Sequence, residues 1–350
     1  MKFTRLLFFL TAGLTGVTAH GQIFVVNYQS GRIGKYTTVG TLVQTNLITG
    51  LVASCIALDA NWQLYVAGGS KMGLYTSAGA PLNTNLITGL NSPFGIALDG
   101  NGYVYVASYN NGTVGKYTTS GATVNASLIY NLSYPCGVAL DGNGNLFLGE
   151  AGRGRVGKYT TSGTAVNTAL ITGVSPEGSI AVDGSGNLYV PNYYAGTIGK
   201  YSGSGSTINA SLVTGLSYPS GVALDGNGHL FIGNDGGSGG PTGQGTIGEY
   251  TTNGVAVNPT LITGLTQPYC LIAVSMAVPE PAGNLLKAVK PSFSNMFIGI
   301  NYQLQVSGDL NTWTNQGSMF TATNTSMIYP QYWDVDNWNK LFFRLQVTPQ

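Results

Sequence analysis

A short apolar segment recurs along most of the chain about every 42 residues, and this period limits the available folds more than any other feature. The segment reads Ile-Ala-Leu-Asp or a close variant, and it starts at Ile56, Ile96, Val138, Ile180, Val222 and Ile272. Each unit contains four short runs in which Val, Ile, Leu and Tyr alternate with small or polar residues, a pattern typical of β-strands. Four strands in a unit of this length predict an all-β fold, the β-propeller.

The order of the strands predicts how such a propeller closes. The first strand type occurs six times, and the second strand type also occurs six times, beginning with residues 22–27. The chain therefore enters the repeats at a second strand and leaves them at a first strand, residues 271–275. We expect this last strand to complete the opening sheet, which gives a six-bladed β-propeller over residues 22–277. Closure of that kind removes exposed sheet edges.

The units share a sequence motif, P-x-G-[IV]-A-L-D-G-N-G-N-L-[YF]-V-[AP]-N followed by G-T-[IV]-G-K-Y. This motif resembles the NHL repeat. It is also similar to the wider group that holds the senescence-marker, gluconolactonase and streptogramin-lyase propellers. The resemblance implies the fold and leaves the function open, because propellers of this kind include lactonases, lyases and binding scaffolds.

The two ends of the chain differ from the repeats. Lys2, Arg5, an apolar stretch over 6–14 and the small residues before Gln22 predict a signal peptide over 1–21. We therefore expect a protein that is secreted or held at the cell surface or in the periplasm, without a membrane span. After a linker over 278–290, residues 291–350 contain alternating runs and three of the four Trp residues. They predict a small C-terminal module that resembles a β-sandwich.

Composition excludes two classes of function. The 14 Lys and Arg residues against 13 Asp and Glu leave no basic surplus, so we expect no nucleic-acid partner. The chain has two His residues, and removal of the signal peptide leaves only His229, which makes His-based catalysis difficult to assemble. His229 also falls between a first and a second strand, away from the expected site. No catalytic residue is assigned, and we expect a monomer.

Ligands of propellers usually bind at the face where the second-to-third and fourth-to-first connections surround the central axis. The candidate binding residues that the repeats place there are Asn27, Tyr28, Tyr109, Glu150, Glu177, Asn192, Tyr193, Asn234 and Asp235. The same connections also supply Phe94, Tyr134, Cys136, Tyr218 and Tyr269. Tyrosine suits a half-exposed contact surface. Packing between blades is the alternative explanation for these rings.

Two functions follow from this face. The first is a binding scaffold for a carbohydrate, a peptide or a protein. The second, which the resemblance to gluconolactonases implies, is a metal-dependent lactonase-like hydrolase or a lyase-like enzyme. In that case Glu150, Glu177 and Asp235 would hold Ca²⁺ or another divalent cation through oxygen ligands. The competing interpretation is that these are solvated loop carboxylates, with Glu150 neutralised by Arg153 or Arg155. We expect binding rather than catalysis.

Two further patterns have a structural explanation. Asp-Gly-Asn-Gly and its variants follow the first strand of most units, where residues that tolerate positive φ favour a tight hairpin. Cys55, Cys136 and Cys270 each lie just before or at the start of a first strand. Export permits a disulfide between Cys55 and Cys270, which belong to adjacent blades of the closed ring. Three buried small apolar side chains are the other interpretation.

Overall fold

The structure is a computed structural model, and it describes residues 21–236, 244–274, 288–289, 292–294, 296–307, 310–328, 333–334 and 342–347. The chain divides into two compact units, Met1–Met276 and Ala277–Gln350. The predicted signal peptide, apart from Gly21, and most of the predicted linker lie outside the described residues. No helix in the described part is long and apolar enough to cross a membrane.

The described part of the first unit contains six four-stranded antiparallel sheets. The first joins β24 (Pro268–Val274), β1 (Gln22–Asn27), β2 (Arg32–Thr37) and β3 (Leu42–Ile48). The second joins β4 (Ala53–Leu58), β5 (Gln63–Gly68), β6 (Lys71–Thr76) and β7 (Pro81–Thr88). The third joins β8 (Pro93–Leu98), β9 (Tyr103–Ser108), β10 (Thr113–Thr118) and β11 (Thr123–Ile129).

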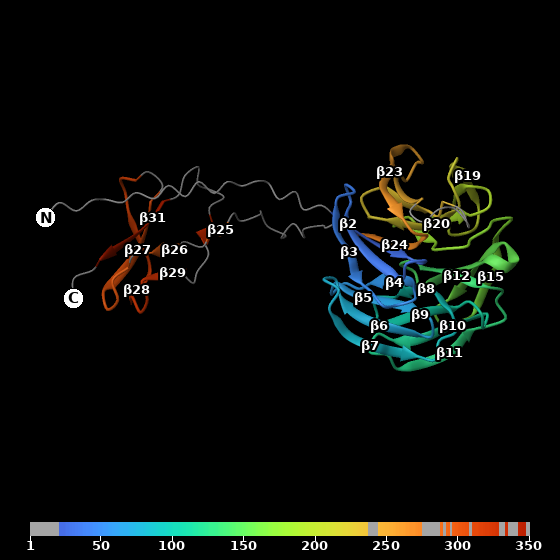
Figure 1. Ribbon diagram of the computed structural model, residues 1–350, viewed down its shortest axis with the longest axis horizontal. Helices are drawn as coiled ribbons and strands as arrows, with labels where there is room; N and C mark the ends of the chain where they lie inside the picture. The colour runs from blue at the N-terminus through green and yellow to red at the C-terminus, as the bar shows by residue number, and fades with distance from the viewer. Residues whose placement is uncertain are drawn as a thin grey trace. The chain divides into compact units, whose positions relative to one another are not determined.

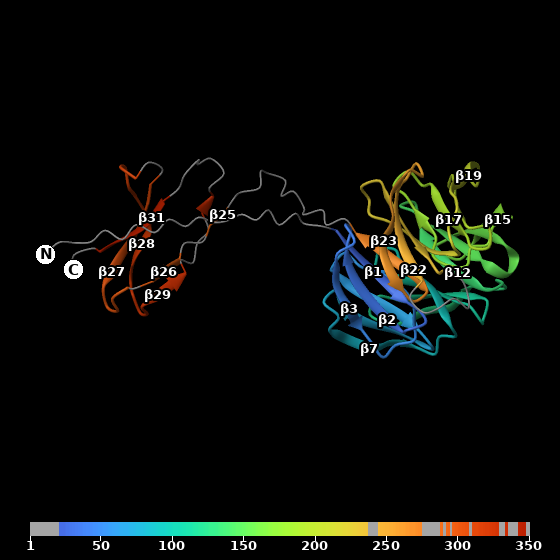
Figure 2. The ribbon, with the colours of Figure 1, turned by 45° about the horizontal axis from the view of Figure 1, so that its top comes forward.

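The other three sheets repeat this order. The fourth joins β12 (Pro135–Leu140), β13 (Asn145–Glu150), β14 (Arg155–Thr160) and β15 (Ala165–Thr172), with the short 3₁₀ helix η1 (Ala151–Arg153) between β13 and β14. The fifth joins β16 (Ala181–Val182), β17 (Leu188–Asn192), β18 (Thr197–Tyr201) and β19 (Thr207–Val213). The sixth joins β20 (Pro219–Leu224), β21 (His229–Asn234), β22 (Gly245–Thr251) and β23 (Ala256–Leu265). Figures 1 and 2 show the sheets grouped around a common centre, with strands such as β7, β11 and β15 on the outside.

In five of the sheets the aspartate after the first strand builds the hairpin that follows it. Asp141 Oδ1 accepts the backbone N–H groups of Asn143 and Asn145, each at 2.9 Å, and Gly144 has a φ of 77°. The same pair of bonds occurs at Asp59, Asp99, Asp183 and Asp225. The side chain thus replaces a missing backbone partner in the turn. The hairpin interpretation of this motif is confirmed.

Buried aromatic rings fill the space between the sheets. Each second strand carries one fully buried aromatic residue at the same position of the repeat. These residues are Phe24, Tyr65, Tyr105, Phe147, Tyr189 and Phe231. A lysine of the third strand covers several of them, as Lys158 does at 5.3 Å from the Phe147 ring centroid. That lysine then donates to the Gly203 carbonyl of the following sheet at 3.0 Å. Apolar burial and a cation–π contact therefore join one sheet to the next.

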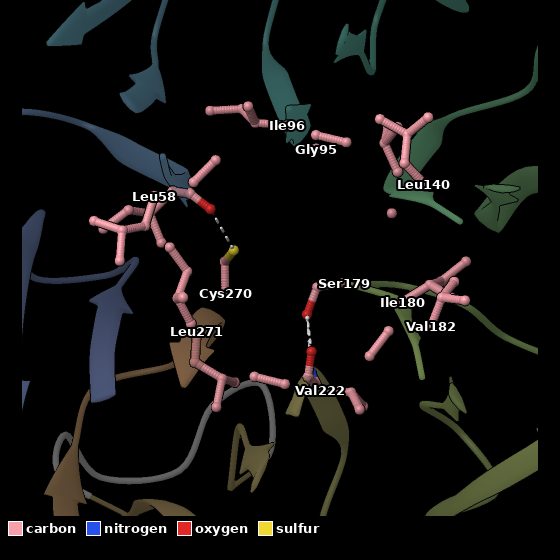
Figure 3. A pocket seen from close by; sticks show the side chains of 18 of the residues that line it. Leu58, Gly95, Ile96, Leu140, Ser179, Ile180, Val182, Val222, Cys270 and Leu271 are labelled. Carbon is pink, nitrogen blue, oxygen red and sulfur yellow. Dashed lines mark hydrogen bonds between the residues drawn. The ribbon is translucent and has the colours of Figure 1, made fainter. Parts of the chain in front are cut away.

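The two ends of the first unit meet in one sheet. β1 and β24 pair antiparallel, with Phe24 opposite Ile272 and Val26 opposite Cys270. The first strands of all six sheets line one cavity of about 460 Å³, which Figure 3 shows from close by. Side chains on these strands bond to carbonyls of the neighbouring sheet, among them Ser54 to Pro93, Cys136 to Pro176, Ser179 to Val222, Ser220 to Pro268 and Cys270 to Ile56.

Of the two interpretations of the cysteines, the structure supports free buried side chains and not a disulfide between Cys55 and Cys270. All three cysteines are free and buried. Cys270 Sγ lies 3.8 Å from the Ile56 carbonyl oxygen, and Cys55 Sγ lies 3.8 Å from the Pro93 carbonyl oxygen. Each thiol is therefore directed at the next first strand around the cavity, which makes the cysteines small buried groups that join neighbouring sheets.

The second unit is also all-β in its described residues. Its strands are β25 (Ala288–Val289), β26 (Ser292–Ser294), β27 (Asn301–Ser307), β28 (Thr314–Thr321), β29 (Ser326–Ile328), β30 (Trp333–Asp334) and β31 (Phe342–Val347). They pair as β28-β27-β31, β26-β29 and β25-β30. A small core of Met296, Tyr302 and Ala322, with Phe293 and Leu345 packed against it, holds the unit together. The sandwich-like architecture stays a prediction.

Candidate functional site

Two connections of each sheet lie next to each other at one end of the first unit. The residue that follows the second strand donates its N–H to the connection that precedes the first strand. These bonds run from Tyr28 to Gln267, Tyr109 to Ser92, Ala151 to Tyr134, Tyr193 to Ser175 and Asp235 to Tyr218, at 2.9–3.2 Å. We call the surface formed by these connections the axial face. The sequence repeats had placed both sets of connections on this face.

Strained backbone turns side chains toward this face. Ser92, Tyr134, Tyr218 and Gln267 each precede the proline that opens a first strand, and each has a φ between 49° and 53°. Residues other than glycine seldom adopt this left-handed conformation. Because it recurs at the same place in four sheets, it belongs to the repeat. At two of these positions the side chain is a half-exposed tyrosine, with Tyr134 51% and Tyr218 40% exposed.

Five rings form the first aromatic cluster, which consists of Tyr28, Phe94, Tyr109, Tyr134 and Tyr269. Tyr109 stacks on Tyr134 with ring centroids 4.8 Å apart, and Phe94 lies 4.9 Å from Tyr109. Tyr269 packs its edge on Phe94 at 5.4 Å, and Tyr28 lies 5.6 Å from Tyr269. Phe94 also lines the central cavity, so the cluster lies at one end of that cavity. Contacts of this geometry stabilise rings beyond their burial alone.

Three rings form the second aromatic cluster, which consists of Tyr193, Tyr194 and Tyr218. Tyr193 lies 5.1 Å from Tyr218 and 5.2 Å from Tyr194, which is 72% exposed. The Tyr193 hydroxyl donates to Asp235 Oδ2 at 2.8 Å. Burial, followed by this bond and the charge of Asp235, raises the pKa of Tyr193. Tyr193 is thereby held as a neutral hydrogen-bond donor.

Three of the predicted binding residues accept hydrogen bonds from the backbone of the axial face. Asn27 Oδ1 accepts the N–H of Thr266 at 3.2 Å, and Asn192 Oδ1 accepts the N–H of Ser175 at 3.0 Å. Glu150 Oε2 accepts the N–H of Ser133 at 3.0 Å in the same way. Each side chain ends a second strand and supports the neighbouring connection. These oxygens thus support the neighbouring connections, and the assignment of the three residues to ligand binding stays a prediction.

Glu150 also has two arginine partners. Its side chain is 0% exposed; Oε2 lies 2.6 Å from Arg153 Nη1 and Oε1 lies 2.7 Å from Arg155 Nε. Both carboxylate oxygens are therefore engaged. Glu150 is not free to ligate a metal, and the interpretation in which the arginines neutralise it is confirmed. Arg153 additionally donates to the Asn131 carbonyl at 2.7 Å.

The remaining predicted residues differ in their surroundings. Asn234 donates to Thr246 Oγ1 at 3.2 Å, while its buried Oδ1 has no partner in the described part of the chain. Asp235 is 5% exposed, and the same holds for its Oδ1. Glu177 is partly buried, and burial raises the pKa of its carboxyl group. Among the described residues, its carboxylate forms no hydrogen bond or ion pair.

The described residues contain no group of three or more His, Cys, Asp or Glu side chains that would hold a metal ion. Burial, followed by the charge of Glu177, raises the pKa of the Cys136 thiol to about 12, so it is protonated at neutral pH. His229 Nδ1 lies 2.8 Å from Asp225 Oδ2, at the hairpin between β20 and β21. It is therefore at the other end of the sheet from the axial face, as the repeats predicted.

Comparison with known proteins identifies the fold. No family model and no curated protein matches the chain. A chain in the crystal structure of a nidogen/laminin complex aligns with a TM-score of 0.58 at 15% identity, covering 73% of this chain and 98% of that one. A Bacteroides caccae protein of unknown function aligns with a TM-score of 0.59 at 15% identity, over 73% and 99% of the two chains. A streptogramin B lyase aligns with a TM-score of 0.55 at 20% identity, over 72% and 83%.

The chain is a β-propeller. At these identities the likeness concerns the fold alone. What the propeller does must therefore be argued from the axial face itself.

Proposed function

We propose that this propeller is a secreted binding module whose axial face holds a peptide, a protein or a carbohydrate. The observation that carries the proposal is the pair of aromatic clusters, eight rings that gather on one face with several of them half exposed. Tyrosine offers a large apolar surface and a hydroxyl with little conformational entropy to lose, which suits it to contact surfaces.

The architecture behind this proposal is a closed ring of six blades of the NHL and gluconolactonase type. The six sheets, the pairing of β24 with β1 and the common cavity between the first strands support it. Such a ring keeps the connections of all blades in fixed relative positions, so the aromatic rings are held ready for a ligand. The N-terminal sequence supports export after removal of residues 1–21.

The structural neighbours come from both functional classes. One belongs to a complex of two proteins, nidogen and laminin, and another is a streptogramin B lyase. The alternative for this chain is a metal-dependent lactonase-like hydrolase or a lyase. It would require oxygen ligands around a cation, and the arginine partners of Glu150 remove one of the three carboxylates that we considered for that role. The binding proposal, in contrast, depends only on the aromatic clusters described above.

Substitution of one ring tests the binding proposal. Tyr109→Ala removes the ring that joins Phe94 to Tyr134, and we expect affinity for a ligand found by glycan-array and peptide-library screening to fall about tenfold or more. Tyr103→Ala is the control, because Tyr103 begins the same strand β9 and lies away from the axial face. Affinities are measured by calorimetry or surface plasmon resonance.

Two results would contradict the proposal. The first is a saturable ligand whose affinity changes neither with Tyr109→Ala nor with Tyr193→Ala. The second is stoichiometric Ca²⁺ or Zn²⁺ in the purified protein together with metal-dependent lactone hydrolysis, which would establish the enzyme instead. Metal analysis and a lactone hydrolysis assay on the same preparation distinguish these outcomes.

A further inference from the structure

The first strand of the fifth sheet is shorter than the first strands of the other sheets. The repeat predicts a strand over 180–183, but it is reduced to β16, which pairs with β17 only at Ala181 and Val182.

The segment before β16 binds to the next sheet instead. The Ser179 N–H donates to the Ser220 carbonyl at 3.1 Å, and the Ser179 hydroxyl bonds to both the carbonyl and the N–H of Val222. Figure 3 shows Ser179 and Val222 joined in this way at the cavity. On the other side, the Pro176 carbonyl accepts the thiol of Cys136 at 3.0 Å. The segment that contains Glu177 is therefore bonded to the fourth sheet on one side and to the sixth sheet on the other.

The segment that carries Glu177 lies between the two aromatic clusters. On one side Tyr193 donates its N–H to the Ser175 carbonyl at 3.0 Å. On the other side the Cys136 thiol lies 3.0 Å from the Pro176 carbonyl and 3.3 Å from the Tyr134 carbonyl.

Besides burial, the charge of Glu177 contributes to the raised pKa values of Tyr109 and Tyr269 in the first cluster and of Tyr193 in the second. A carboxylate partly withdrawn from water normally acquires a hydrogen-bond donor or a cation. Glu177 has neither among the described residues, so the hydrogen-bonding capacity and the charge of its carboxylate are left unmatched by them.

A second acidic side chain near the same rings also lacks a full set of partners. Asp235 is 5% exposed; its Oδ2 accepts the Tyr193 hydroxyl, and no described residue bonds to its Oδ1. Arg153 and Arg155 both contact Glu150, and Arg32 begins β2 at the same end of the first sheet, opposite Asn27. Lysines such as Lys116 and Lys158 donate to turn carbonyls at the other end of the sheets. Glu177 and Asp235 thus have no cation partner among the described residues.

We propose that the axial face binds the ammonium or guanidinium group of a basic peptide side chain, with Glu177 as its counter-ion and the rings of Tyr109, Tyr193 and Tyr269 around it. The inference rests on the proposed binding function and adds the chemistry of its ligand. Ring faces attract a cation through their quadrupole, and a carboxylate forms strong charge-assisted hydrogen bonds with N–H donors. A lysine or arginine side chain satisfies both.

The geometry favours an organic cation over a metal ion. A hard divalent cation needs six or more oxygen ligands, whereas the described residues contain no group of three or more His, Cys, Asp or Glu side chains that could hold one. The face is also open, with Tyr134, Tyr194 and Tyr218 between 40% and 72% exposed. Such a surface has room for the peptide backbone on either side of the basic residue.

The test compares a lysine peptide with its uncharged counterpart. The probe is the peptide acetyl-Gly-Lys-Gly-Lys-Gly-amide, whose ends carry no charge, and the control is the same peptide with both lysine side chains acetylated. We expect saturable binding of the lysine peptide by calorimetry, and at least tenfold weaker binding of the acetylated one. Glu177→Gln should weaken binding of the lysine peptide at least tenfold.

Glu249→Gln is the matched control, because burial also raises the pKa of Glu249, on β22, where other third strands carry lysine. It should leave binding unchanged. Thermal unfolding shows whether Glu177→Gln folds: burial raises the pKa of Glu177, so the neutral amide should increase Tm at pH 7. Equal binding of both peptides, or full binding by Glu177→Gln, would overturn the inference.

The failures of the two proposals can be told apart. If a neutral glycan or peptide binds in a way that Tyr109→Ala abolishes while the lysine peptide does not bind, the axial face is a binding site and the cation inference is wrong. If no ligand responds to Tyr109→Ala or Tyr193→Ala, the proposed function itself fails. Displacement of the lysine peptide by tetramethylammonium would support the cation site, and displacement by glucose alone would contradict it.

Discussion

Glu150 and Glu177 show how the same residue type serves two purposes on one face. Glu150 is fully buried, and both of its oxygens contact arginines or a backbone N–H. Glu177 is partly buried and has no such partner among the described residues, so burial raises its pKa. The first carboxylate stabilises the fold, whereas the second reduces stability at neutral pH. An unpaired charge of this kind is more often found at functional sites than in a purely structural region.

At the residue scale, Glu150→Gln is expected to destabilise the protein by about 2–3 kcal/mol, because it leaves Arg153 and Arg155 without their buried counter-charge. Denaturant unfolding of the purified protein measures the change. Arg153→Ala should cost less, since the Arg153 side chain is 41% exposed and that of Arg155 is 21% exposed. A Glu150→Gln variant as stable as the parent would show that the ion pairs contribute nothing net.

At the scale of elements, the hairpin aspartates stabilise the turns only while they are ionised. Burial raises the pKa of Asp141 and Asp183, but hydrogen bonds from the two following N–H groups and from Asn145 or Asn187 lower it by more. Both values therefore lie below the ordinary 3.8. The resulting stability is present above pH 3.8 and is lost as pH falls through the lower pKa values of the folded protein.

The variant carrying both Asp141→Asn and Asp183→Asn should therefore be less sensitive to acid. We expect it to be less stable at pH 7 by roughly 1 kcal/mol per site, because a neutral amide is a weaker acceptor than a carboxylate. Between pH 5 and pH 2 its unfolding free energy should fall less than that of the parent. Denaturant titrations at each pH test this, and identical pH slopes for the two proteins would refute it.

The fourth strands show a further regularity at this scale. The register shifts where Lys116 pairs with Asn125, and Asn125 Oδ1 accepts the N–H of Ser127 at 3.0 Å. The equivalent bond occurs at Asn83, Asn167, Asn209 and Asn258. These outer strands are edge strands, and a bulge that uses one of their N–H groups makes pairing with another chain less favourable.

At the scale of the whole molecule, the pairing of β1 with β24 joins residues almost 250 positions apart. A chain that ends at Leu265 lacks β24, so it should expose the edge of β1 together with the apolar side of Phe24. We expect this truncated chain to aggregate or to lose cooperative unfolding. A chain that ends at Met276 is the control, because it keeps β24 and lacks only the second unit. Cooperative unfolding of the shorter chain, followed by circular dichroism, would show that closure is dispensable.

Much of the arrangement could be predicted from local patterns. Alternating Val, Ile and Tyr residues predicted the strands, and Asp-Gly-Asn-Gly predicted the hairpins, because both depend on short-range backbone preferences. The gathering of Tyr28, Tyr109 and Tyr193 on one face followed from the repeat. The partners of Asn27, Asn192 and Glu150 could not be predicted, because they bond to connections 17 to 239 positions away.

The sequence by itself determined the repeat, the strand order and the face on which the aromatic rings lie, because these follow from periodic patterns and from turns a few residues long. Only the tertiary structure decided which side chains on that face are already bonded. It paired Glu150 with two arginines, directed the cysteines at carbonyl groups of neighbouring sheets and left Glu177 without a partner among the described residues. The physical reason is that a side chain's partners depend on which distant segments packing brings within hydrogen-bond distance.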